Sequence, residues 1–510
     1  MRRRIRGAAL LPKRTARATV QTLKRIPTAG RVCFVIAFVN AAIWGVVVPP
    51  FQVPDEVVHF AYAQYLAQTG KPPPQGPGAQ YSPEEEVAIA QLQVLPVIGH
   101  PEERGVLTAP ESEAVHTALA AKPEPLGPGG STAASNQPPL YYALEAIPYW
   151  LSPSHDLLTR LALMRLLSAL LAGFTVLAVF LFMRELMPRT RWAWSVGALV
   201  VAFQPTFDFI AAGVNGDNLL FFASASTFLA LLRAYRHGLT LKRGVAIGLA
   251  VAIGTLAKLT FIALLPGIAL AIALLAWRAL PSGRRKALLA LGTTVTVAAL
   301  PVALYAVLNV AVWHRGGGLT AGGLAGATSS NLASGQVVTM RESLDYIWQL
   351  YLPRLWFMHH AFFTTNQLAG TWLDGMIGHF GWLDYTFPVW VYKYAEYVAI
   401  GFVVLALAGL FRLRRAIRPL LPLSVCFLVM AVGLLASIGY AGVRYQLNTG
   451  EQFAQARYLF PLLVFYATFI VLVARALPRR WAATFGALLV VLAMAHGLFA
   501  ETLTISRYYG

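Results

Sequence analysis

The chain has 510 residues, of which 57% are hydrophobic and only 12% are charged, and its formal net charge is +19. Because soluble domains carry about 25% charged residues, this composition excludes an ordinary water-soluble domain. Two cysteines, Cys33 and Cys426, are too few for a disulfide-rich scaffold. The mean hydropathy of +0.59 comes from long apolar blocks, which predict an all-α polytopic membrane protein.

Eleven apolar runs are candidates for membrane-spanning helices, which need about 20 mostly apolar residues. In chain order they lie near 32–49, 161–183, 192–210, 216–235, 244–257, 261–279, 288–310, 394–411, 420–440, 458–474 and 481–499. Only Lys258-Leu259-Thr260 separates the fifth run from the sixth. A single helix over both runs would be about 54 Å long, against an apolar bilayer core of about 30 Å. The two runs therefore predict a helical hairpin.

The basic residues predict the orientation in the membrane. Of the 41 lysines and arginines, 28 lie with a single acid, Glu185, in segments that alternate spans would place on one side: 1–31, 184–191, 233–243, 278–286, 412–418 and 475–480. Cytoplasmic loops carry the excess of basic residues. We therefore expect a multi-pass protein of the inner (plasma) membrane with a cytoplasmic N-terminus and an extracytoplasmic C-terminus. Because membrane topology accounts for the net charge, a nucleic-acid partner is not expected.

The predicted topology divides the chain into four parts. These are a basic cytoplasmic tail (1–31), a transmembrane module (32–310) with a first extracytoplasmic loop (50–136), a second extracytoplasmic loop (311–392), and C-terminal transmembrane helices (393–510). Long loops on a rigid scaffold are where binding and catalytic residues concentrate. We therefore expect any chemistry on the outer face.

Each outer loop has its own composition. The first contains 13 of the 31 prolines and a predicted amphipathic helix from Pro54 to about Gln68. The second opens with a Gly/Ser stretch, Gly316 to Gly335, and continues with five of the twelve tryptophans. Tryptophan favours the membrane–water boundary, so this second stretch is expected to lie along the outer surface.

The first loop begins with a concentrated polar motif, Pro54-Asp55-Glu56-Val57-Val58-His59-Phe60. On a helix, Asp55 and Glu56 both lie one turn from His59. Acids at a helix start are ordinary, but partly apolar surroundings would raise a carboxyl pKa toward that of a general base. The same three residues form a candidate divalent-cation group, although they lack the ligand count of a closed site.

This motif resembles the Pro-x-Asp-Glu-x-x-His-Phe segment of a bacterial family of predicted polytopic membrane proteins of unassigned function. That family looks like part of the GT-C superfamily of membrane glycosyltransferases. Further segments fit in the same order: Asn136-Gln137-Pro138-Pro139-Leu140-Tyr141-Tyr142, Arg165-Leu166-Leu167-Ser168-Ala169-Leu170, Asn215-Gly216-Asp217-Asn218, Ala257-Lys258-Leu259-Thr260 and Gln455-Ala456-Arg457-Tyr458-Leu459-Phe460-Pro461. The last departs from the pattern, because Ala456 stands where glycine is usual.

The resemblance implies a GT-C-like enzyme that transfers a sugar from a polyprenyl-phosphate donor, with inversion, to an envelope glycan, lipid or protein. An acid of the first outer loop would activate the acceptor hydroxyl: Asp55 is the first candidate, and Glu56 is the second, or a partner that orients the acceptor or binds a metal. Some members need a divalent cation and others do not, so the cofactor stays open.

Several residues are candidates for binding the lipid phosphate or the sugar. The cations expected at the outer boundary are Lys258, Arg457, Arg165 and Arg354, and His59, Tyr141 and Tyr142 are further candidates. Each has a structural alternative. Lys258 would snorkel from a helix end, Arg165 would pair with a buried acid such as Asp217, and the tyrosines would anchor the chain at the membrane boundary. Asp217 would equally cap the fourth span.

Other polar residues carry weaker expectations. His359 and His360 are interpreted as surface residues, Glu84 to Glu86 as a solvated face, and Asp374 and Asp384 as candidate acceptor contacts.

Two other classes of function remain open. A transporter or flippase of a lipid-linked sugar or envelope precursor would also carry charge between apolar helices, although such proteins often show paired repeats, and no clear repeat is present here. A non-catalytic assembly partner would need none of the candidate residues.

Overall fold

The computed structural model describes residues 26–76, 78–106, 108–121, 127–154, 156–316, 339–361, 367–449 and 453–510. These residues are mostly helical, as the composition predicts. Their one sheet is a two-stranded antiparallel hairpin, in which β1 (His379–Phe380) pairs with β2 (Tyr385–Thr386). The first 25 residues of the basic tail and residues 317–335 of the Gly/Ser stretch lie outside the described residues.

Eight helical segments of the described chain are long and apolar enough to cross a membrane, or nine if a bent pair counts as one span. Seven are α3 (Thr28–Val47), α9 (Leu157–Leu186), α12 (Asp217–His237), η1 with α14 (Leu259–Leu264 and Leu265–Ala279), α15 (Arg284–Ala311), η5 with α21 (Ala456–Leu462 and Leu463–Arg475) and α22 (Arg479–Tyr509). The eighth holds both α19 (Val389–Ile417) and α20 (Leu421–Thr449), joined by η4 (Arg418–Leu420). The total of eleven spans stays a prediction.

The apolar helices are interrupted at two places that particular residues explain, Pro205 and Lys258. The apolar run 192–210 forms two helices, α10 (Arg191–Ala202) and α11 (Pro205–Ala211), bent by 62°. Pro205 cannot continue the ladder of α10 and instead starts α11, whose first turn the Gln204 side chain caps. The expected hairpin is present: α13 (Leu241–Ala257) ends where Lys258 takes an extended conformation before η1.

The remaining helices belong to the connecting segments. Those of the first loop and its return to the membrane are α4 (Glu56–Thr69), α5 (Pro83–Gln91), α6 (Val94–Val97), α7 (Ala109–Ala120) and α8 (Leu140–Leu151). Those of the second loop are α17 (Met340–Tyr351), η3 (Leu368–Leu373) and α18 (Asp374–Gly378), while η2 (Leu280–Ser282) joins α14 to α15. The predicted helix from Pro54 to Gln68 is confirmed as α4.

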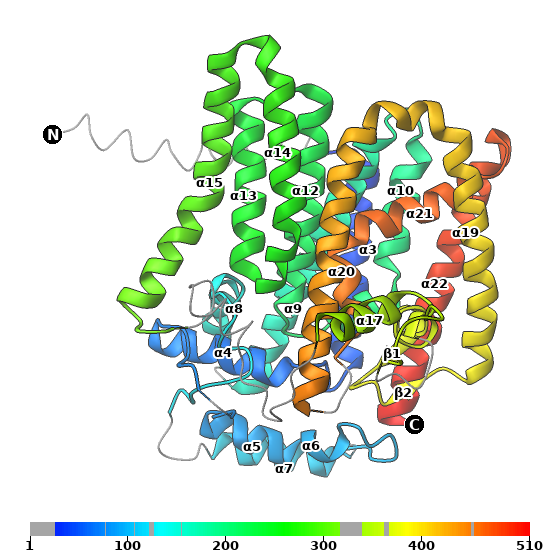
Figure 1. Cartoon of the computed structure of the whole chain (residues 1–510). Coiled ribbons are helices and arrows are strands. Elements are labelled where there is room, and N and C mark those ends of the chain that lie inside the picture. Colours follow the sequence, from blue (N-terminus) through cyan, green and yellow to red (C-terminus); the bar gives the residue numbers. More distant parts are fainter. Residues whose placement is uncertain are drawn as a thin grey trace.

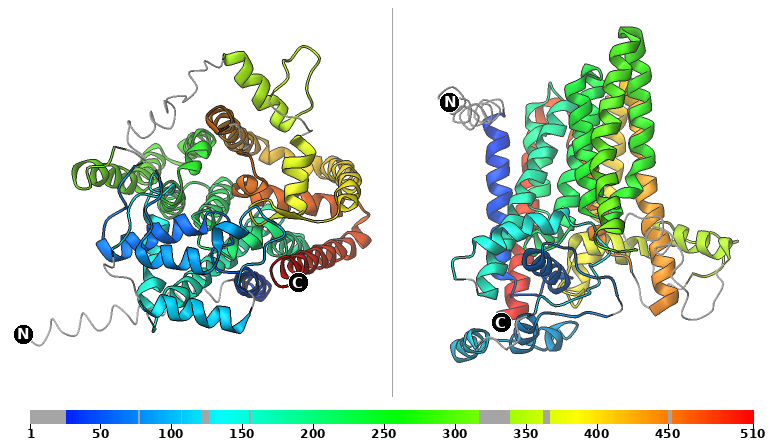
Figure 2. Two further views of the ribbon diagram at one scale, coloured as in Figure 1. Left: turned by 90° about the horizontal axis from the view of Figure 1, so that it is seen from below. Right: turned by 90° about the vertical axis from the view of Figure 1, so that its left-hand side faces the viewer.

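The long helices form a bundle, and the connecting helices cover one of its ends (Figures 1 and 2). Helix α9 packs against α3 and α12, and α12 continues the layer to α13 and α15. Helix α21 packs against α10 and α19, and α20 packs against α14. Helices α4 to α7, the β hairpin and the C-terminus all lie at the same end (Figure 1). The two long loops therefore share one face of the bundle.

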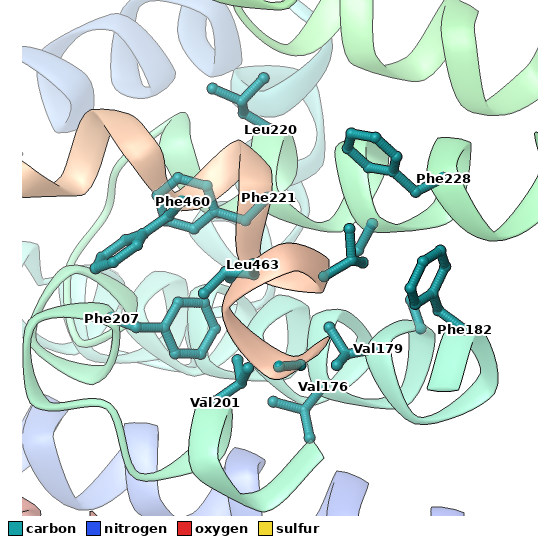
Figure 3. Close-up of a cluster of buried hydrophobic side chains, with 14 of the residues drawn as sticks. Val176, Val179, Phe182, Val201, Phe207, Leu220, Phe221, Phe228, Phe460 and Leu463 are labelled. Carbon is teal, nitrogen blue, oxygen red and sulfur yellow. The ribbon is translucent and has the colours of Figure 1, made fainter. Parts of the chain in front are cut away.

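The core of the bundle is aromatic where η5 packs against α11 and α12. Phe460 of η5 contacts Phe207 of α11 and Phe221 of α12, with ring centroids 6.1 and 5.5 Å apart. Figure 3 shows these rings with aliphatic side chains of α9, α10 and α21 around them. Such pairs stabilise packing beyond their buried area, so η5 is held firmly at the covered end of the bundle.

A buried ion pair joins the first loop to the bundle. The Arg165 side chain of α9 donates from Nε and Nη2 to the Glu56 carboxylate, at 2.8 and 2.6 Å. Its remaining donors bind the carbonyls of Gly45, Val48 and Pro49 at the end of α3. Backbone N–H groups of Phe51 and Val214 donate to the same carboxylate, at 2.9 and 3.0 Å.

This network ties together α3, α4, α9 and the turn before α12. Glu56 is fully buried and its carboxylate accepts four hydrogen bonds, so both charges are compensated where water is excluded. The pair therefore sets the geometry of the turn that carries Asp55.

We predict that Glu56→Gln destabilises the protein strongly, because it leaves the Arg165 guanidinium buried without a counter-charge. Breaking one side of a buried pair costs about 3–5 kcal/mol. Thermal unfolding of the purified protein in detergent measures the loss.

The matched control is Glu102→Gln, which removes an exposed carboxylate paired only with His100. Its melting temperature should equal that of the wild type. Equal stability of Glu56→Gln and wild type would contradict the structural role of the pair.

Candidate functional site

The turn that precedes α4 is held in an unusual backbone conformation. Phe51 and Asp55 both have φ of 64°, in the left-handed region, which a bulky residue adopts only when its surroundings enforce it. Gly213 packs against Val53 so closely that a Cβ at that glycine would lie 2.5 Å from the valine. The Asn215 side chain also donates to the Pro54 carbonyl at 3.1 Å. The loop before α12 therefore fixes where Asp55 points.

Asp55 is paired through one oxygen and open at the other. Arg457 Nη2 donates to Asp55 Oδ2 at 2.6 Å, while Oδ1 accepts no hydrogen bond from the described residues and the side chain is 37% exposed. Burial acts to raise the pKa of Asp55, but the charge of Arg457, its hydrogen bond and the charge of Lys258 outweigh it and hold the pKa below its ordinary value of 3.8. The expected rise in pKa is therefore wrong in direction, because Arg457 supplies a counter-charge.

Arg457 is a buried cation with spare donors. Only 5% of the residue is exposed, and its Nε and Nη1 have no hydrogen-bond partner in the described part of the chain. It lines a cavity of about 230 Å³ together with Pro54, Thr206, Gln367, Thr371 and His379. A buried guanidinium with two donor nitrogens that lack a partner, beside a cavity lined partly by polar side chains, is a candidate anion site.

Lys258 and Asp217 form a second ion pair, 2.7 Å between Nζ and Oδ1. The Asp217 Oδ2 atom is buried and has no partner among the described residues. Both residues act electrostatically on His59, as do Asp55 and Arg457, so the five side chains form one cluster. Arg165 does pair with a buried acid, as its structural alternative predicts, but that acid is Glu56 and not Asp217.

His59 is buried and held by aromatic side chains. Its Nδ1 lies 2.8 Å from the Tyr142 hydroxyl, and the Tyr142 ring stacks on Tyr62 with centroids 3.6 Å apart. Burial, reinforced by Lys258, lowers the His59 pKa to about 4, so the imidazole is neutral at pH 7. His59 can therefore hydrogen-bond there without adding charge.

The two tyrosines of the Pro-Pro-Leu-Tyr-Tyr segment lie inside the protein. Tyr141 is fully buried, and its hydroxyl lies 3.0 Å from Ser168 Oγ, which also donates to Glu145. Tyr142 is equally buried against His59. Their interpretation as anchors at the membrane boundary is wrong, since neither ring reaches the surface.

Glu56 and Asp55 are neighbours in sequence but belong to different networks. The Glu56 carboxylate is saturated by Arg165 and two backbone N–H groups, and Asp55 alone faces the cluster. The expected convergence of Asp55, Glu56 and His59 on one point is therefore not present. In the described residues, no group of three or more His, Cys, Asp or Glu side chains is placed to hold a metal ion.

The second loop supplies one wall of the cavity. Thr206 Oγ1 of α11 donates to the Gly375 carbonyl, and Gln204 donates to the Met376 carbonyl, at 2.9 and 2.7 Å. A Cβ added at Gly375 would lie 2.8 Å from the Ala456 Cβ. A close approach therefore exists at Ala456, with the glycine on the opposite segment.

Gln367, Thr371 and His379 were missed by the sequence analysis. They line the cavity from an aromatic-rich loop in which no motif marks them. The docking of Gly375 on Ala456 brings them there, and Gly375 is one of several glycines in this stretch, so the sequence does not single it out.

The remaining candidates lie apart from the cluster. Arg354 is exposed and donates to the Met358 carbonyl, and the exposed His359 pairs with Asp345 at 3.3 Å. Asp384 is buried against Arg507, which also donates to carbonyls of the first loop. Asp384 thus links the two loops.

The solvated face expected at Glu84 to Glu86 is wrong for two of its three acids. Glu85 is fully buried in a capping box with Ser82, and Glu84 lies 3.8 Å from Arg160 with only 12% of its side chain exposed.

The lowered pKa of His59 predicts a pH dependence of stability. The unfolded chain binds this proton with the ordinary pKa of 6.5, and the folded protein only at about 4. The contribution of His59 to stability is therefore complete above pH 6.5 and is lost as the pH falls toward 4. Subtracting the melting temperatures of His59→Gln from those of wild type between pH 4 and 8 isolates this contribution. The exposed His116→Gln variant is the control, and a wild-type-minus-His59→Gln difference that does not change with pH would contradict a buried neutral imidazole.

Comparison with solved structures returns oligosaccharyltransferases of Archaeoglobus fulgidus. The apo form is 14% identical with a TM-score of 0.46, and the alignment covers 94% of this chain and 56% of that one. The AglB protein in complex with an inhibitory peptide and a dolichol-phosphate is 15% identical, with the same TM-score and coverage. The chain thus spans little more than half the length of these proteins. No curated protein matches it.

Family comparison gives a broader match along the chain. The profile described as "Predicted membrane protein (DUF2142)" matches residues 38–466, which is well over half of the sequence and includes every residue of the cluster. The chain therefore belongs to the DUF2142 family of predicted membrane proteins.

Proposed function

We propose that this protein is an inverting membrane glycosyltransferase that uses a polyprenyl-phosphate sugar and acts on a cell-envelope acceptor. The loops and the cluster would face the outside of the plasma membrane, and the N-terminus the cytoplasm. The observation that carries the proposal is the Arg457 side chain, with two unused buried donors beside the half-open Asp55 carboxylate. The order of the GT-C-like motifs along the chain supports it.

The surroundings of η5 suit a ligand with an anionic head and a long apolar tail. On one side, Arg457 borders the polar cavity. On the other, Leu459, Phe460 and Leu462 line a groove of about 760 Å³ between α19, α20, α21 and η3. The groove lining is apolar apart from Glu396 and the Tyr466 hydroxyl. One short helix thus separates a phosphate-sized site from a surface able to hold an isoprenoid chain.

The proposed reaction moves one proton and exchanges one bond. Asp55 Oδ1 accepts the proton of the acceptor hydroxyl while the acceptor oxygen forms a bond to the anomeric carbon of the sugar. The bond from that carbon to the lipid phosphate oxygen breaks, and the phosphate leaves with the electron pair. Arg457 and Lys258 stabilise the charge that develops on it. Attack from the side opposite the phosphate inverts the anomeric carbon.

The other candidates position these groups. Glu56 and Arg165 hold the turn that carries Asp55, and Tyr142 with His59 packs behind it. Because the Asp55 pKa is held low, the carboxylate is ionised across the physiological pH range, and its open oxygen can accept a hydrogen bond from the acceptor hydroxyl.

We predict that Asp55→Asn abolishes transfer while leaving the protein folded. An amide at this position no longer accepts the proton, and general-base catalysis is worth about 10²–10⁴-fold in rate. The assay is product formation by purified protein with labelled lipid-linked sugars, and donor binding should change by much less than the rate.

The matched control is Asp345→Asn, which removes an acid paired with His359 away from the cluster, and it should retain activity. Transfer at the wild-type rate in Asp55→Asn would contradict the proposed base. If the protein moved the lipid-linked sugar from one leaflet of the vesicle membrane to the other without forming a glycosidic bond, it would be a flippase instead. Repeating the assay with a chelator determines whether a divalent cation takes part.

A further inference from the structure

A cavity at the opposite end of the bundle lies among basic residues. It has a volume of about 870 Å³, is open to the surface and is lined by the ends of α12, α13, α14 and α15. These ends lie far from α4 to α7, at the top of Figure 1. The predicted topology places this face toward the cytoplasm. The cavity is therefore remote from Asp55 and takes no part in the proposed transfer.

Four cations line this cavity, and no acid is among its lining residues. They are Arg236, Lys242, Arg278 and Lys286. The nearby acid Glu185 is engaged by His237 and Arg233, at 2.6 and 3.7 Å. The cations therefore lack a protein counter-charge within the cavity, and their mutual repulsion favours an anionic occupant.

Arg278 is held in place by its neighbours. Its guanidinium lies over the Tyr235 ring, 3.8 Å from the centroid, and the Tyr235 hydroxyl donates to the Pro419 carbonyl at 2.8 Å. Arg243 occupies the carbonyls of His237 and Gly238 at the end of α12, so these carbonyls do not compete for the cavity cations. The arrangement thus holds the exposed Arg278 guanidinium against the Tyr235 ring at the cavity.

The rest of the lining is mostly aliphatic, with Tyr235, His237 and Thr240 among it, and its leucines extend from the cavity to the exposed surface. Leu275 is buried at the cavity, while Leu241 and Leu289 are each 53% exposed. A ligand in contact with both parts needs an anionic head beside an apolar chain. Basic pockets between transmembrane helices on the cytoplasmic side are suited to anionic lipid headgroups.

We propose that this cavity binds the phosphate headgroup of an anionic phospholipid from the adjacent leaflet. Arg278, Lys242 and Lys286 contact the headgroup, and one acyl chain lies along Leu241 and Leu289. A zwitterionic lipid binds less well because its amine meets the same cations. The proposal is independent of the reaction on the other face.

The test measures lipid binding by native mass spectrometry of the whole protein exchanged into detergent with added phosphatidylglycerol. The triple variant Lys242→Gln/Arg278→Gln/Lys286→Gln should bind phosphatidylglycerol at least about tenfold more weakly than wild type, because each basic residue contributes to the attraction. Arg236 is left intact because it also donates to the Leu186 carbonyl.

The matched control removes three charges from the same face outside the cavity: Arg412→Gln/Arg414→Gln/Arg415→Gln. Its affinity should stay within about twofold of wild type, since general surface charge is not the cause. Equal weakening in both triple variants would overturn the proposal, as would equal binding of phosphatidylcholine and phosphatidylglycerol by wild type. If inorganic phosphate displaced the lipid at equal concentration, the site would be one for free phosphate and the lipid assignment would be wrong.

A single variant covers the case in which the cavity triple variant does not fold. Lys286→Gln alone should weaken phosphatidylglycerol binding by about threefold or more, and an unchanged affinity would contradict the proposal.

Discussion

The buried pair between Glu56 and Arg165 is the interaction on which the rest of the covered face depends. A charge in a water-free interior must be compensated by an opposite charge and by hydrogen bonds. Here one carboxylate and one guanidinium meet that requirement together with backbone groups from two separate segments, the end of α3 with the turn after it and the loop before α12. The consequence is a turn that cannot relax, and Asp55 is its last residue.

The adjacent acids Asp55 and Glu56 consequently differ in how many of their oxygens are engaged in hydrogen bonds. Both oxygens of the Glu56 carboxylate accept hydrogen bonds that hold the fold together. Asp55, by contrast, pairs one oxygen with Arg457 and leaves the other open. Arg457 and Asp217 also have buried polar atoms that make no hydrogen bond to the described residues. Unsatisfied polar groups are costly in a folded protein. Their presence around Asp55, with Arg457 in the wall of a cavity and an apolar groove on the other side of η5, favours a site for an anionic amphiphile over a purely structural cluster.

Much of the architecture could be predicted from the sequence because the membrane constrains it strongly. Apolar blocks indicated the long helices, and Lys258 marked the break between α13 and η1. The bend at Pro205 was not predicted, because the apolar run 192–210 has the length of one continuous span, although proline cannot continue a helix. The proximity of Asp55, Lys258 and Arg457 followed from their predicted position at one boundary.

The choice of partners could not be predicted in the same way. Whether Arg165 meets Glu56 or Asp217 depends on side-chain directions set by packing across more than a hundred residues of chain. The burial of Tyr141 and Glu85 likewise depends on how the first loop folds back on the bundle, which local composition does not reveal. The walls supplied by Thr371 and His379 arise from a contact between two small residues, Gly375 and Ala456.

The proposed function depends on Arg457 Nε and Nη1, which lack a partner among the described residues and would bind the phosphate of a lipid-linked ligand. The most direct measurement is the affinity of a short-chain polyprenyl phosphate for wild type and for Arg457→Lys, which keeps the charge beside Asp55 but loses the planar set of donors. Lysine does not reproduce the paired geometry of a guanidinium. We therefore predict that Arg457→Lys binds the polyprenyl phosphate about tenfold or more weakly than wild type. An unchanged affinity would contradict it.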